Sequence, residues 1–277
     1  MSDSQEKNFI KLTKKEGNNW RSIKSIKEYH FSGKYGTDKL ILDYGCGPGY
    51  GSEILANYAN KVIGVDIREK PLNYARNHRK ANNLSFKRIS TTYPHSFENQ
   101  SFDIIVLSHV IEHLPNVRAT LKELKRLLKT NGKLIINTPN RKFRLLPLQK
   151  PFNPDHKREY TLRSFRKELT YFFRKVEICG VYGTEEINRI ERLRMKRSKN
   201  PIKVYLINPI MFFLKKILSR ELNLRIIEFE ERLNRKVISS SFNILSDFNT
   251  TKSYTLDDVC IGNELKKSFD FLAVCHK

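Results

Sequence analysis

The chain has 277 residues, of which 39% are hydrophobic, 29% charged and 11% aromatic, a composition typical of one large globular domain or of a domain with an elaboration. These values exclude a chain that is mainly disordered, collagen-like or membrane-spanning. Charge is the unusual feature, because 52 Lys and Arg against 29 Asp and Glu leave a formal net charge of +23, which favours an anionic partner such as nucleic acid, a lipid headgroup surface or a phosphorylated substrate.

Cysteine spacing and apolar runs indicate the compartment. The four cysteines are widely spaced and form no CxxC pair, which favours reduced thiols over a zinc cluster or a disulfide scaffold. The first thirty residues carry charge throughout and lack the apolar stretch of a secretory signal. The longest uncharged apolar run, residues 204–214, is interrupted by Pro209 and is far shorter than the roughly 20 residues that a transmembrane helix needs. We therefore expect a cytoplasmic protein without a transmembrane helix.

From Lys39 onward, short apolar runs alternate with segments of helical spacing, and this alternation predicts strand–helix units around a parallel sheet. The expected strands are residues 40–42, 62–65, 84–89, 102–107, 133–137, 173–181 and 269–276. Helices are expected after Gly51, over residues 71–82, around Leu121 to Leu128, and over residues 161–172 with Thr161 as N-cap. Asn131 and Gly132 are typical of a left-handed C-cap that would end the third helix.

A segment of different composition lies between the last two expected strands. Residues 186–236 contain 14 Lys or Arg against 6 Asp or Glu, and their apolar residues have helical spacing. We interpret this segment as part of an inserted helical subdomain. Such an insertion at one edge of the sheet can cover the carboxyl ends of the strands, where open α/β sheets bind ligands.

The densest chemical signal is the sequence DYGCGPGYG, which begins at Asp43, follows the first strand and opens a helix. Its glycines permit backbone dihedrals and a close ligand approach that a Cβ would forbid. Asp66 ends the second strand, where a carboxylate can accept hydrogen bonds from both hydroxyls of a ribose. The dinucleotide pattern GxGxxG fails, because Tyr50 occupies the position of its third glycine. An acid at Asp43 would repel phosphates but suits an ammonium group, so adenosine and ammonium together indicate S-adenosyl-L-methionine.

Five segments, in order, carry a resemblance to a known family: LDYGCGPGYG, VIGVDI, SFDIIVLSHVIEHL, LKTNGKLIINTPN and NPDHKREYT. They resemble class I S-adenosylmethionine-dependent methyltransferases over about residues 39–183 and again in the last strand, in particular bacterial and archaeal members linked to glycan or cell-envelope biosynthesis. The resemblance implies a Rossmann-like α/β fold with a seven-stranded, mostly parallel sheet in the order 3-2-1-4-5-7-6, helices on both faces, and a helical insertion between strands six and seven.

The same resemblance implies a division of the chain and a set of binding residues. Residues 1–38 would form an N-terminal helical segment, 39–183 the methyltransferase core, 184–250 a basic helical insertion that acts as a lid or a membrane or partner contact, and 251–277 the return to the core. The residues expected to bind the cofactor are Asp43, Gly45, Cys46, Gly47, Gly49, Asp66, Ile67, Thr91 and Ser108. Among them Asp66 would hold the ribose and Ile67 the adenine face. Thr91 lies where many relatives carry an Asp for the adenine amino group.

Three histidines are candidate catalytic residues. His109, Glu112 and His113 form the pattern HxxEH of inverted zinc peptidases, but the segment leaves a strand of a cofactor-binding fold and no further acidic ligand helix is evident. Some relatives carry ExxEH here and use it for a divalent ion; His109 replaces the first Glu, so we predict no metal. If His113 and His156 converge, one of them is a candidate general base. Alternatively, Glu112 and His113 form a structural pair at a helix N-terminus.

Together these features predict methyl transfer by in-line displacement, which requires mainly alignment of the reacting groups. We expect the acceptor to be a hydroxyl of an anionic or lipid-linked glycan; RNA methylation, methylation of a quinone-pathway or other small molecule, and cofactor binding without catalysis remain alternatives. Nucleic acid is disfavoured because the sequence lacks an RNA-binding module.

The segment that runs from Lys203 to Arg220 is apolar with basic flanks, which is typical either of a helix at an anionic bilayer on the inner face of the membrane or of a core helix of the insertion. Oligomeric state is left open.

Overall fold

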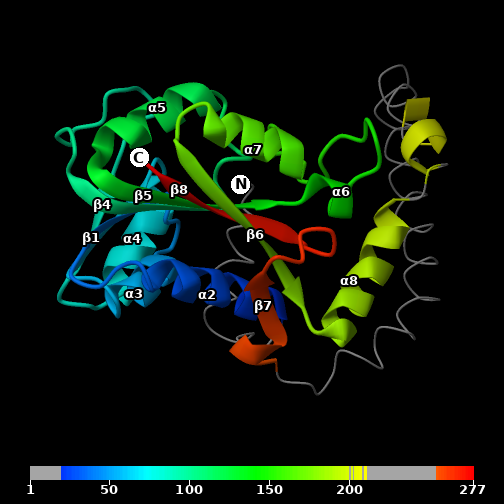
Figure 1. Ribbon diagram of the computed structural model, residues 1–277, viewed down its shortest axis with the longest axis horizontal. Helices are drawn as coiled ribbons and strands as arrows, with labels where there is room; N and C mark the ends of the chain where they lie inside the picture. Colours follow the sequence, from blue (N-terminus) through cyan, green and yellow to red (C-terminus); the bar gives the residue numbers. More distant parts are fainter. Residues whose placement is uncertain (1–19, 200, 202, 208, 211–253) are drawn as a thin grey trace, which may run out of the picture.

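The computed structural model describes residues 20–199, 201, 203–207, 209–210 and 254–277. In this part of the chain, eight strands form one sheet in the order β3-β2-β1-β4-β5-β8-β6-β7 (Figure 1). The strands are β1 Leu40–Tyr44, β2 Lys61–Asp66, β3 Leu84–Arg88, β4 Phe102–Ser108, β5 Leu128–Pro139, β6 Lys175–Gly183, β7 Val259–Gly262 and β8 Asp270–His276. β1 to β5 pair in parallel, whereas β8 is antiparallel to both β5 and β6.

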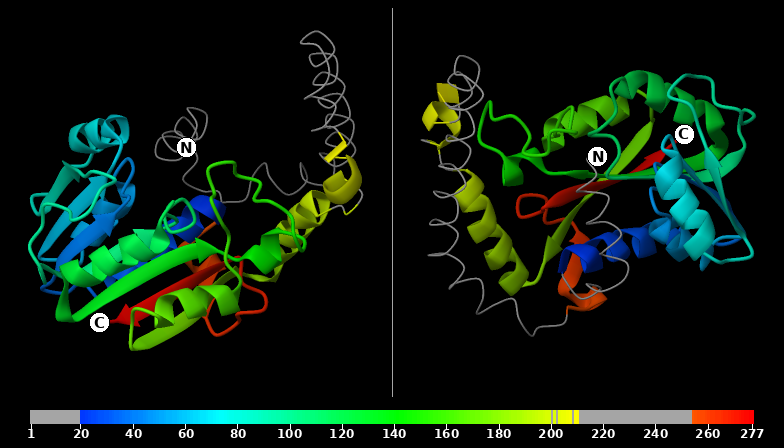
Figure 2. Two further views of the ribbon diagram at one scale, coloured as in Figure 1. Left: turned by 90° about the horizontal axis from the view of Figure 1, so that it is seen from above. Right: turned by 180° about the vertical axis from the view of Figure 1, so that it is seen from behind.

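Helices cover both faces of the sheet (Figures 1 and 2). The described helical elements are α2 Trp20–Gly33, α3 Tyr50–Ala56, α4 Glu69–His78, α5 Val117–Leu127, α6 Arg141–Arg144, α7 Leu162–Thr170, α8 Glu185–Ser198, the π-helix η1 Lys203–Ile207 and the 3-10 helix η2 Leu256–Asp258. α5 and α7 lie on one face, and α2 and α3 lie on the other. Ile41 and Leu42 show the division, because these adjacent, fully buried β1 residues belong to the hydrophobic clusters of opposite faces.

The predicted fold class is confirmed, with one strand more than expected. The order 3-2-1-4-5-7-6 holds when the expected seventh strand is identified as β8. The additional strand is β7, a four-residue strand that pairs antiparallel with β6 at the edge of the sheet. The sequence did not indicate this strand because four residues are too few to establish an alternating pattern. The sheet therefore has eight strands rather than seven.

The end of α5 also differs from the sequence prediction. α5 ends at Leu127, and β5 begins at once, because Leu128 already has extended backbone angles. Asn131 and Gly132 lie inside β5, and neither has a positive φ, so they form no left-handed cap. The pairing of β4 with β5 changes register between Phe102 and Ile104, which accommodates the extra residues of β5.

The described part of the insertion is helical. α8 follows β6, and η1 follows α8 after a short connection. Ile187 of α8 is fully buried and belongs to the same hydrophobic cluster as α2. Most of the segment that runs from Lys203 to Arg220, for which we expected a membrane-surface or core helix, lies outside the described residues. Within the described ranges, no helix combines the length and apolarity needed to cross a bilayer.

Candidate active site

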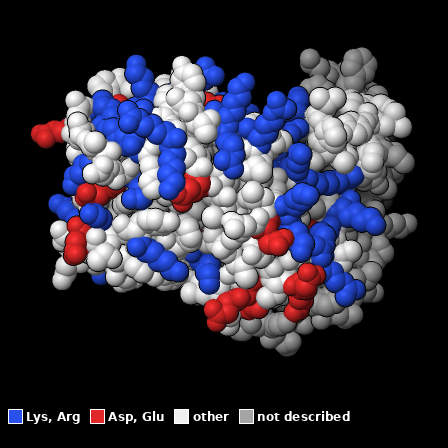
Figure 3. All heavy atoms as spheres, in the orientation of Figure 1, with Lys and Arg blue, Asp and Glu red and all other residues white. Residues whose placement is uncertain are grey.

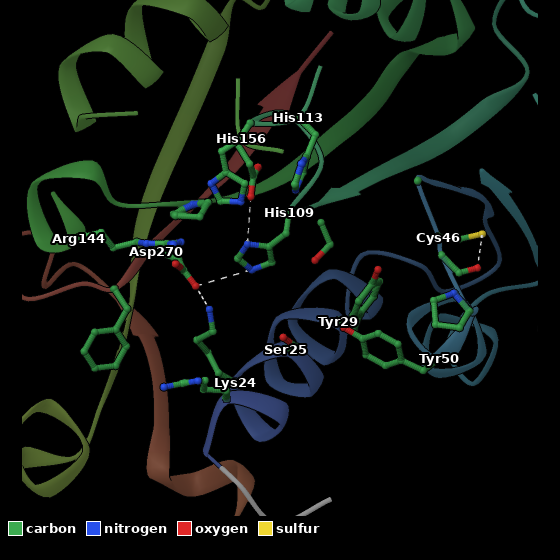
Figure 4. A pocket seen from close by; sticks show the side chains of 18 of the residues that line it. Lys24, Ser25, Tyr29, Cys46, Tyr50, His109, His113, Arg144, His156 and Asp270 are labelled. Atoms are coloured by element: carbon green, nitrogen blue, oxygen red, sulfur yellow. Dashed lines mark hydrogen bonds and ion pairs between the residues drawn. The ribbon is translucent and has the colours of Figure 1, made fainter. Parts of the chain in front are cut away.

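One cavity of about 370 Å³ lies at the carboxyl ends of β1 and β4, where ligands bind in open α/β sheets. The cavity is lined by α2, the loop after β1 with the start of α3, the segment that runs from Arg68 into α4, the turn after β4, the end of β5, α6, the loop before α7, α8 and the start of β8. Figure 4 shows Cys46 and Tyr50 at one side of the cavity, the three candidate histidines in the middle, and Arg144 at the opposite side. The cavity thus joins the glycine-rich loop to the histidines in one continuous space.

The glycine-rich loop after β1 has the backbone geometry that the sequence indicated. Gly45, Gly47 and Gly49 have φ values of 80°, 53° and 77°, in the left-handed region that favours glycine. A Cβ at Gly45 would approach a side-chain atom of Val110 to 2.5 Å, whereas a Cβ at Gly47 would meet no atom within 4 Å. Gly47 lines the cavity, so its missing side chain leaves space for a ligand to approach the backbone.

Asp66 lies at the end of β2 beside this loop, but Asp66 itself does not line the cavity. Its side chain is buried, and the backbone N–H of Gly47 donates to Oδ2 at 3.1 Å. Arg68 donates from its backbone N–H to Oδ1 at 2.9 Å and from Nε to the same oxygen at 3.2 Å. Arg68 itself lines the cavity. The Asp66 carboxylate therefore points at the glycine-rich loop and has the guanidinium of Arg68 as its counter-ion.

Asp43 lies underneath the loop and does not line the cavity. Its carboxylate accepts a hydrogen bond from Ser52 at 2.6 Å and another from the Tyr29 hydroxyl at 3.5 Å. Burial raises the pKa of Asp43 from its ordinary value to about 7. The Asp43 side chain therefore cannot contact an ammonium group in the cavity directly. Instead, its hydrogen bonds connect α2 and α3 to the base of the loop.

The other expected cofactor residues divide into two groups. Cys46 and Ser108 line the cavity, and the Ser108 hydroxyl accepts a hydrogen bond from Asn137 at 3.4 Å. Ile67 and Thr91 do not line it, and both are exposed. The sequence analysis missed five further residues around this end of the cavity: Tyr29, Tyr50, Arg68, Pro71 and Tyr74. Of these, Tyr50 and Arg68 lie next to the expected motifs in the sequence, and this proximity is the signal that could have identified them.

His113 and His156 are brought together. Their ring centroids are 4.7 Å apart with the rings perpendicular, and both residues line the cavity. Nδ1 of His113 lies 3.2 Å from the carbonyl oxygen of Asp155, and because that oxygen only accepts, Nδ1 must carry the proton. Burial lowers the pKa of His113 despite the opposing charge of Glu112. His113 is thus a neutral imidazole whose Nε2 retains its lone pair, which is the state required of a general base.

Glu112 holds the loop that carries His156. Its carbonyl oxygen accepts from the backbone N–H of Lys157 at 2.8 Å and of Arg158 at 3.3 Å. Its carboxylate accepts from the Thr138 hydroxyl at 3.2 Å. Residues 111–113 form a turn, and α5 begins only at Val117, so Glu112 and His113 are not a pair at a helix N-terminus. The predicted alternative, a structural pair at a helix N-terminus, is therefore wrong. Glu112 nevertheless has a structural role, because it holds the loop.

His109 lines the cavity, but both of its ring nitrogens face carboxylates. Its Nε2 lies 3.1 Å from Glu28 Oε2 and 3.7 Å from Asp270 Oδ2, and its Nδ1 lies 3.5 Å from Glu112 Oε1. Burial opposes the charged form, but these carboxylates outweigh it and raise the pKa of His109. Both nitrogens thus face acceptors, which favours an imidazolium. His109 is therefore poorly placed to take a proton from a ligand.

Among the residues that the structure describes, two side-chain groups have ligand atoms within 4.8 Å of one another, close enough to surround an ion: Glu112, His113 and His156, and separately Glu28, His109 and Asp270. The second group already contains a cation, because Lys24 forms ion pairs with both Glu28 and Asp270. The first group has one carboxylate and two imidazoles, a set with fewer oxygen ligands than a hard ion such as Mg²⁺ prefers.

Residues 42–136 match a protein-family model described as a methyltransferase domain. The ubiquinone biosynthesis O-methyltransferase of Actinobacillus pleuropneumoniae serotype 5b (strain L20) is 37% identical over 109 residues, which cover 37% of this chain and 47% of that protein. The protein of the same name from Coxiella burnetii (strain RSA 493 / Nine Mile phase I) is 36% identical over 107 residues, or 38% and 46% of the two chains. The chain thus spans about half the length of the curated relatives it matches.

Solved structures with a similar fold cover more of the chain. A SAM dependent methyltransferase from Aquifex aeolicus has a TM-score of 0.51 and 17% identity, and the match covers 67% of this chain and 94% of that one. A putative methyltransferase from Bacillus halodurans C-125 has a TM-score of 0.51 and 14% identity, covering 91% and 98%. The fold is therefore the Rossmann-like fold of class I methyltransferases. None of these relatives supports the glycan- or envelope-associated type that the sequence resemblance suggested.

Proposed function

We propose that the chain is an S-adenosylmethionine-dependent methyltransferase that methylates a hydroxyl group of a small aromatic acceptor, of the kind found in quinone pathways. The family match over residues 42–136 supports methyl transfer, since it includes the glycine-rich loop, Asp66 and His113. The printed names of the curated relatives support an oxygen acceptor and a quinone-pathway compound over a glycan. The observation that carries the proposal is the single cavity that connects the glycine-rich loop to His113.

The residues at the loop fit the proposed cofactor. The open space over Gly47 admits an adenosyl group to the backbone, and the Asp66 carboxylate beside it is the acceptor that ribose hydroxyls require. When bound, S-adenosylmethionine supplies a methyl group on a positively charged sulfur, which is already activated for displacement. The backbone of Gly45 and Cys46 is held for this task, because both N–H groups donate to the Val65 carbonyl, at 2.7 and 2.9 Å.

In this mechanism His113 receives the proton of the acceptor hydroxyl. A phenol is a weak nucleophile until it loses its proton, and Nε2 of His113 has the free lone pair needed to take it. His156 lies against the His113 ring, and its own Nδ1 is 3.0 Å from Glu159 Oε1, which fixes the ring orientation.

The acceptor end of the cavity suits a flat apolar ring. Trp20, Phe143 and Phe269 line it, with ring centroids 5.2 Å apart for Trp20 and Phe269 and 5.0 Å apart for Phe143 and Phe269. Such a wall contributes apolar burial and ring contacts that a saccharide would use less fully. We therefore favour a phenolic acceptor over a glycan hydroxyl.

The test is transfer of a radiolabelled methyl group to four acceptor pools: small phenols including catechols, extracted lipids, glycans and RNA. We expect label in the phenol pool and none above background in the others. The His113→Gln variant serves as the control, because it removes the base and leaves the glycine-rich loop unchanged. Label that appears only in glycan or RNA would refute the phenolic acceptor, and failure to bind S-adenosylhomocysteine in calorimetry would refute methyl transfer altogether.

A further inference from the structure

The second histidine of the pair, His156, has a buried carboxylate behind it. Its Nδ1 lies 3.0 Å from Oε1 of Glu159, and the side chains of the two residues are only 7% and 0% exposed. Because a carboxylate oxygen accepts hydrogen bonds, Nδ1 carries the proton, and Nε2 has none while the ring is neutral. His156 lines the cavity, whereas Glu159 does not. The carboxylate therefore acts on a ligand only through the imidazole.

The burial of Glu159 is not explained by the contacts around it. Its Oε1 accepts from His156 and lies 3.5 Å from the guanidinium of Arg144. Its Oε2 is buried and has no hydrogen-bond partner within the described residues. An unpaired buried carboxylate oxygen lowers the stability of a fold, so its presence beside the cavity indicates a use in the site.

The backbone on both sides of Glu159 is fixed. After it, the carbonyl oxygen of Tyr160 accepts from the backbone N–H of Arg141 at 2.8 Å. Before it, the backbone N–H of Lys157 donates to the carbonyl oxygen of Glu112, also at 2.8 Å. A carboxylate anchored from both directions does not follow its partner when the partner moves. It is therefore able to impose one orientation on the imidazole that it contacts.

His156 in turn contacts the proposed base, His113. The two ring centroids are 4.7 Å apart and the rings are perpendicular, so the edge of one ring faces the plane of the other. Figure 4 shows the two side chains next to each other. One nitrogen of each ring and one carboxylate oxygen of Glu112 lie within 4.8 Å of one another. His156 therefore limits how far the His113 ring can turn, and with it the position of Nε2.

We propose that Glu159 is a positioning residue for deprotonation of the acceptor and that it acts through His156. Glu159 keeps the proton of His156 on Nδ1 and fixes that ring, and the fixed ring holds Nε2 of His113 toward the acceptor hydroxyl. In the reaction the O–H bond breaks, its proton binds Nε2 of His113, and the oxygen bonds to the methyl carbon as the methyl–sulfur bond breaks. This inference rests on the proposed function. A misaligned base slows methylation only of an acceptor that still carries its proton.

The first test is the tautomer of each ring, which needs no acceptor. Nitrogen-15 NMR of the full chain labelled at histidine, at pH 8, distinguishes a protonated ring nitrogen from a bare one. We expect the proton on Nδ1 in both His113 and His156, and the His156→Gln variant assigns the signals. Glu159→Gln should give His156 a mixture of tautomers, because an amide both donates and accepts. A wild-type His156 with its proton on Nε2 would overturn the proposal.

The second test compares two acceptors of different acidity, with a radiolabelled methyl group at pH 8. Catechol keeps its protons at this pH, whereas 4-nitrocatechol has already lost one. Glu159→Gln and His156→Gln should each lower kcat for catechol by about tenfold or more, and change kcat for 4-nitrocatechol by less than about twofold. The double variant should lose no more than either single variant, because the two side chains act as a unit.

Glu168→Gln is the matched control. Glu168 belongs to α7, lies outside the cavity and forms an ion pair with Arg118 of α5. Figure 3 shows Lys and Arg gathered on the part of the surface where Figure 1 places α5 and α7. The control therefore removes the same negative charge from a basic surface and leaves the histidine pair unchanged. We expect no change in kcat with either acceptor.

Each outcome bears on a different statement. If the wild type methylates neither phenol, or does not bind S-adenosylhomocysteine, the proposed function falls and this inference falls with it. If the wild type methylates both phenols and Glu159→Gln lowers kcat equally with both, Glu159 has only a structural role, and the proposal is refuted while the proposed function stands. An equal loss in Glu168→Gln would refute it too. Should Glu159→Gln fail to fold in circular dichroism, Glu159→Asp replaces it: it keeps the charge, loses the reach, and should show the same difference between the acceptors.

Discussion

The two ends of the cavity are built in different ways. At the cofactor end, the backbone of one loop and the end of the adjacent strand form the site, and the residues that matter lie between Asp43 and Asp66. At the acceptor end, side chains from α2, α6, α8 and the start of β8 meet, although they are up to 250 residues apart in sequence, from Trp20 to Asp270. A site made by local backbone leaves a motif in the sequence, whereas a site made by distant side chains becomes visible only in the fold.

The largest expected effect concerns His113, which lies between the two ends of the cavity. His113→Gln should lower kcat by about 10²- to 10⁴-fold, because the acceptor hydroxyl loses its base, and should leave the affinity for S-adenosylhomocysteine unchanged. Since burial lowers the pKa of His113, the base is neutral throughout the neutral range, and the acidic limb of kcat/KM in the wild type should lie below pH 6.5. Steady-state kinetics from pH 5 to 9 measures both effects. An unchanged kcat would remove His113 from the mechanism.

Gly47→Val tests the cofactor end alone. The valine side chain would enter the open space above the loop, so affinity for S-adenosylhomocysteine should fall by more than about 100-fold. The positive φ of 53° adds a strain of about 1–2 kcal/mol to the folded state. Calorimetry measures binding, and a denaturant titration checks that the sheet remains folded. Normal binding by this variant would mean that the ligand does not approach the loop.

Asp66→Ala should have a smaller effect at the same end. Loss of charge-assisted hydrogen bonds to the ribose is worth about 1.5–3 kcal/mol, or about 10- to 100-fold in affinity. Thr91→Ala is the matched control, because Thr91 is exposed, whereas Asp66 is buried and bonded to the glycine-rich loop. Calorimetry with S-adenosylhomocysteine should show no change for this control. An equal loss in both variants would contradict the position of the cavity.

The last expected effect is on stability rather than on binding, and it concerns Asp43. Its pKa is about 7 in the folded chain, above the ordinary value of 3.8, so the folded state binds the proton more tightly than the unfolded state. The contribution of Asp43 to stability is therefore complete below about pH 4 and decreases as pH rises to 7. Asn does not titrate, so the unfolding free energy of Asp43→Asn relative to wild type should rise with pH across this window, by on the order of 1 kcal/mol per unit. Urea titrations at pH 5, 6 and 8 measure the difference, and a difference that does not depend on pH would place the pKa elsewhere.

The same contrast explains what could be predicted from the sequence. The loop glycines, Asp66 and the order of the main strands follow from local patterns, because a strand–loop–helix unit is encoded in adjacent residues. The convergence of His113 and His156 was stated only as a condition, since it depends on how the loop before α7 returns. Glu28 gave no signal at all: charged residues on an amphipathic helix usually face solvent, and only the packing of α2 buries this one. The burial of Asp43 was also missed, because its place before the glycine-rich loop suggested a carboxylate open to a ligand.

The ion pair between Arg68 and Asp66 has a consequence for the proposed cofactor site. Because Arg68 already pairs with this carboxylate, a ribose that bound there would replace one partner by another, and only the difference between the two would contribute to affinity. Arg68 lies two residues away along the chain and would return to the carboxylate when the nucleoside left. We therefore expect this pair to favour release of the spent cofactor over its retention.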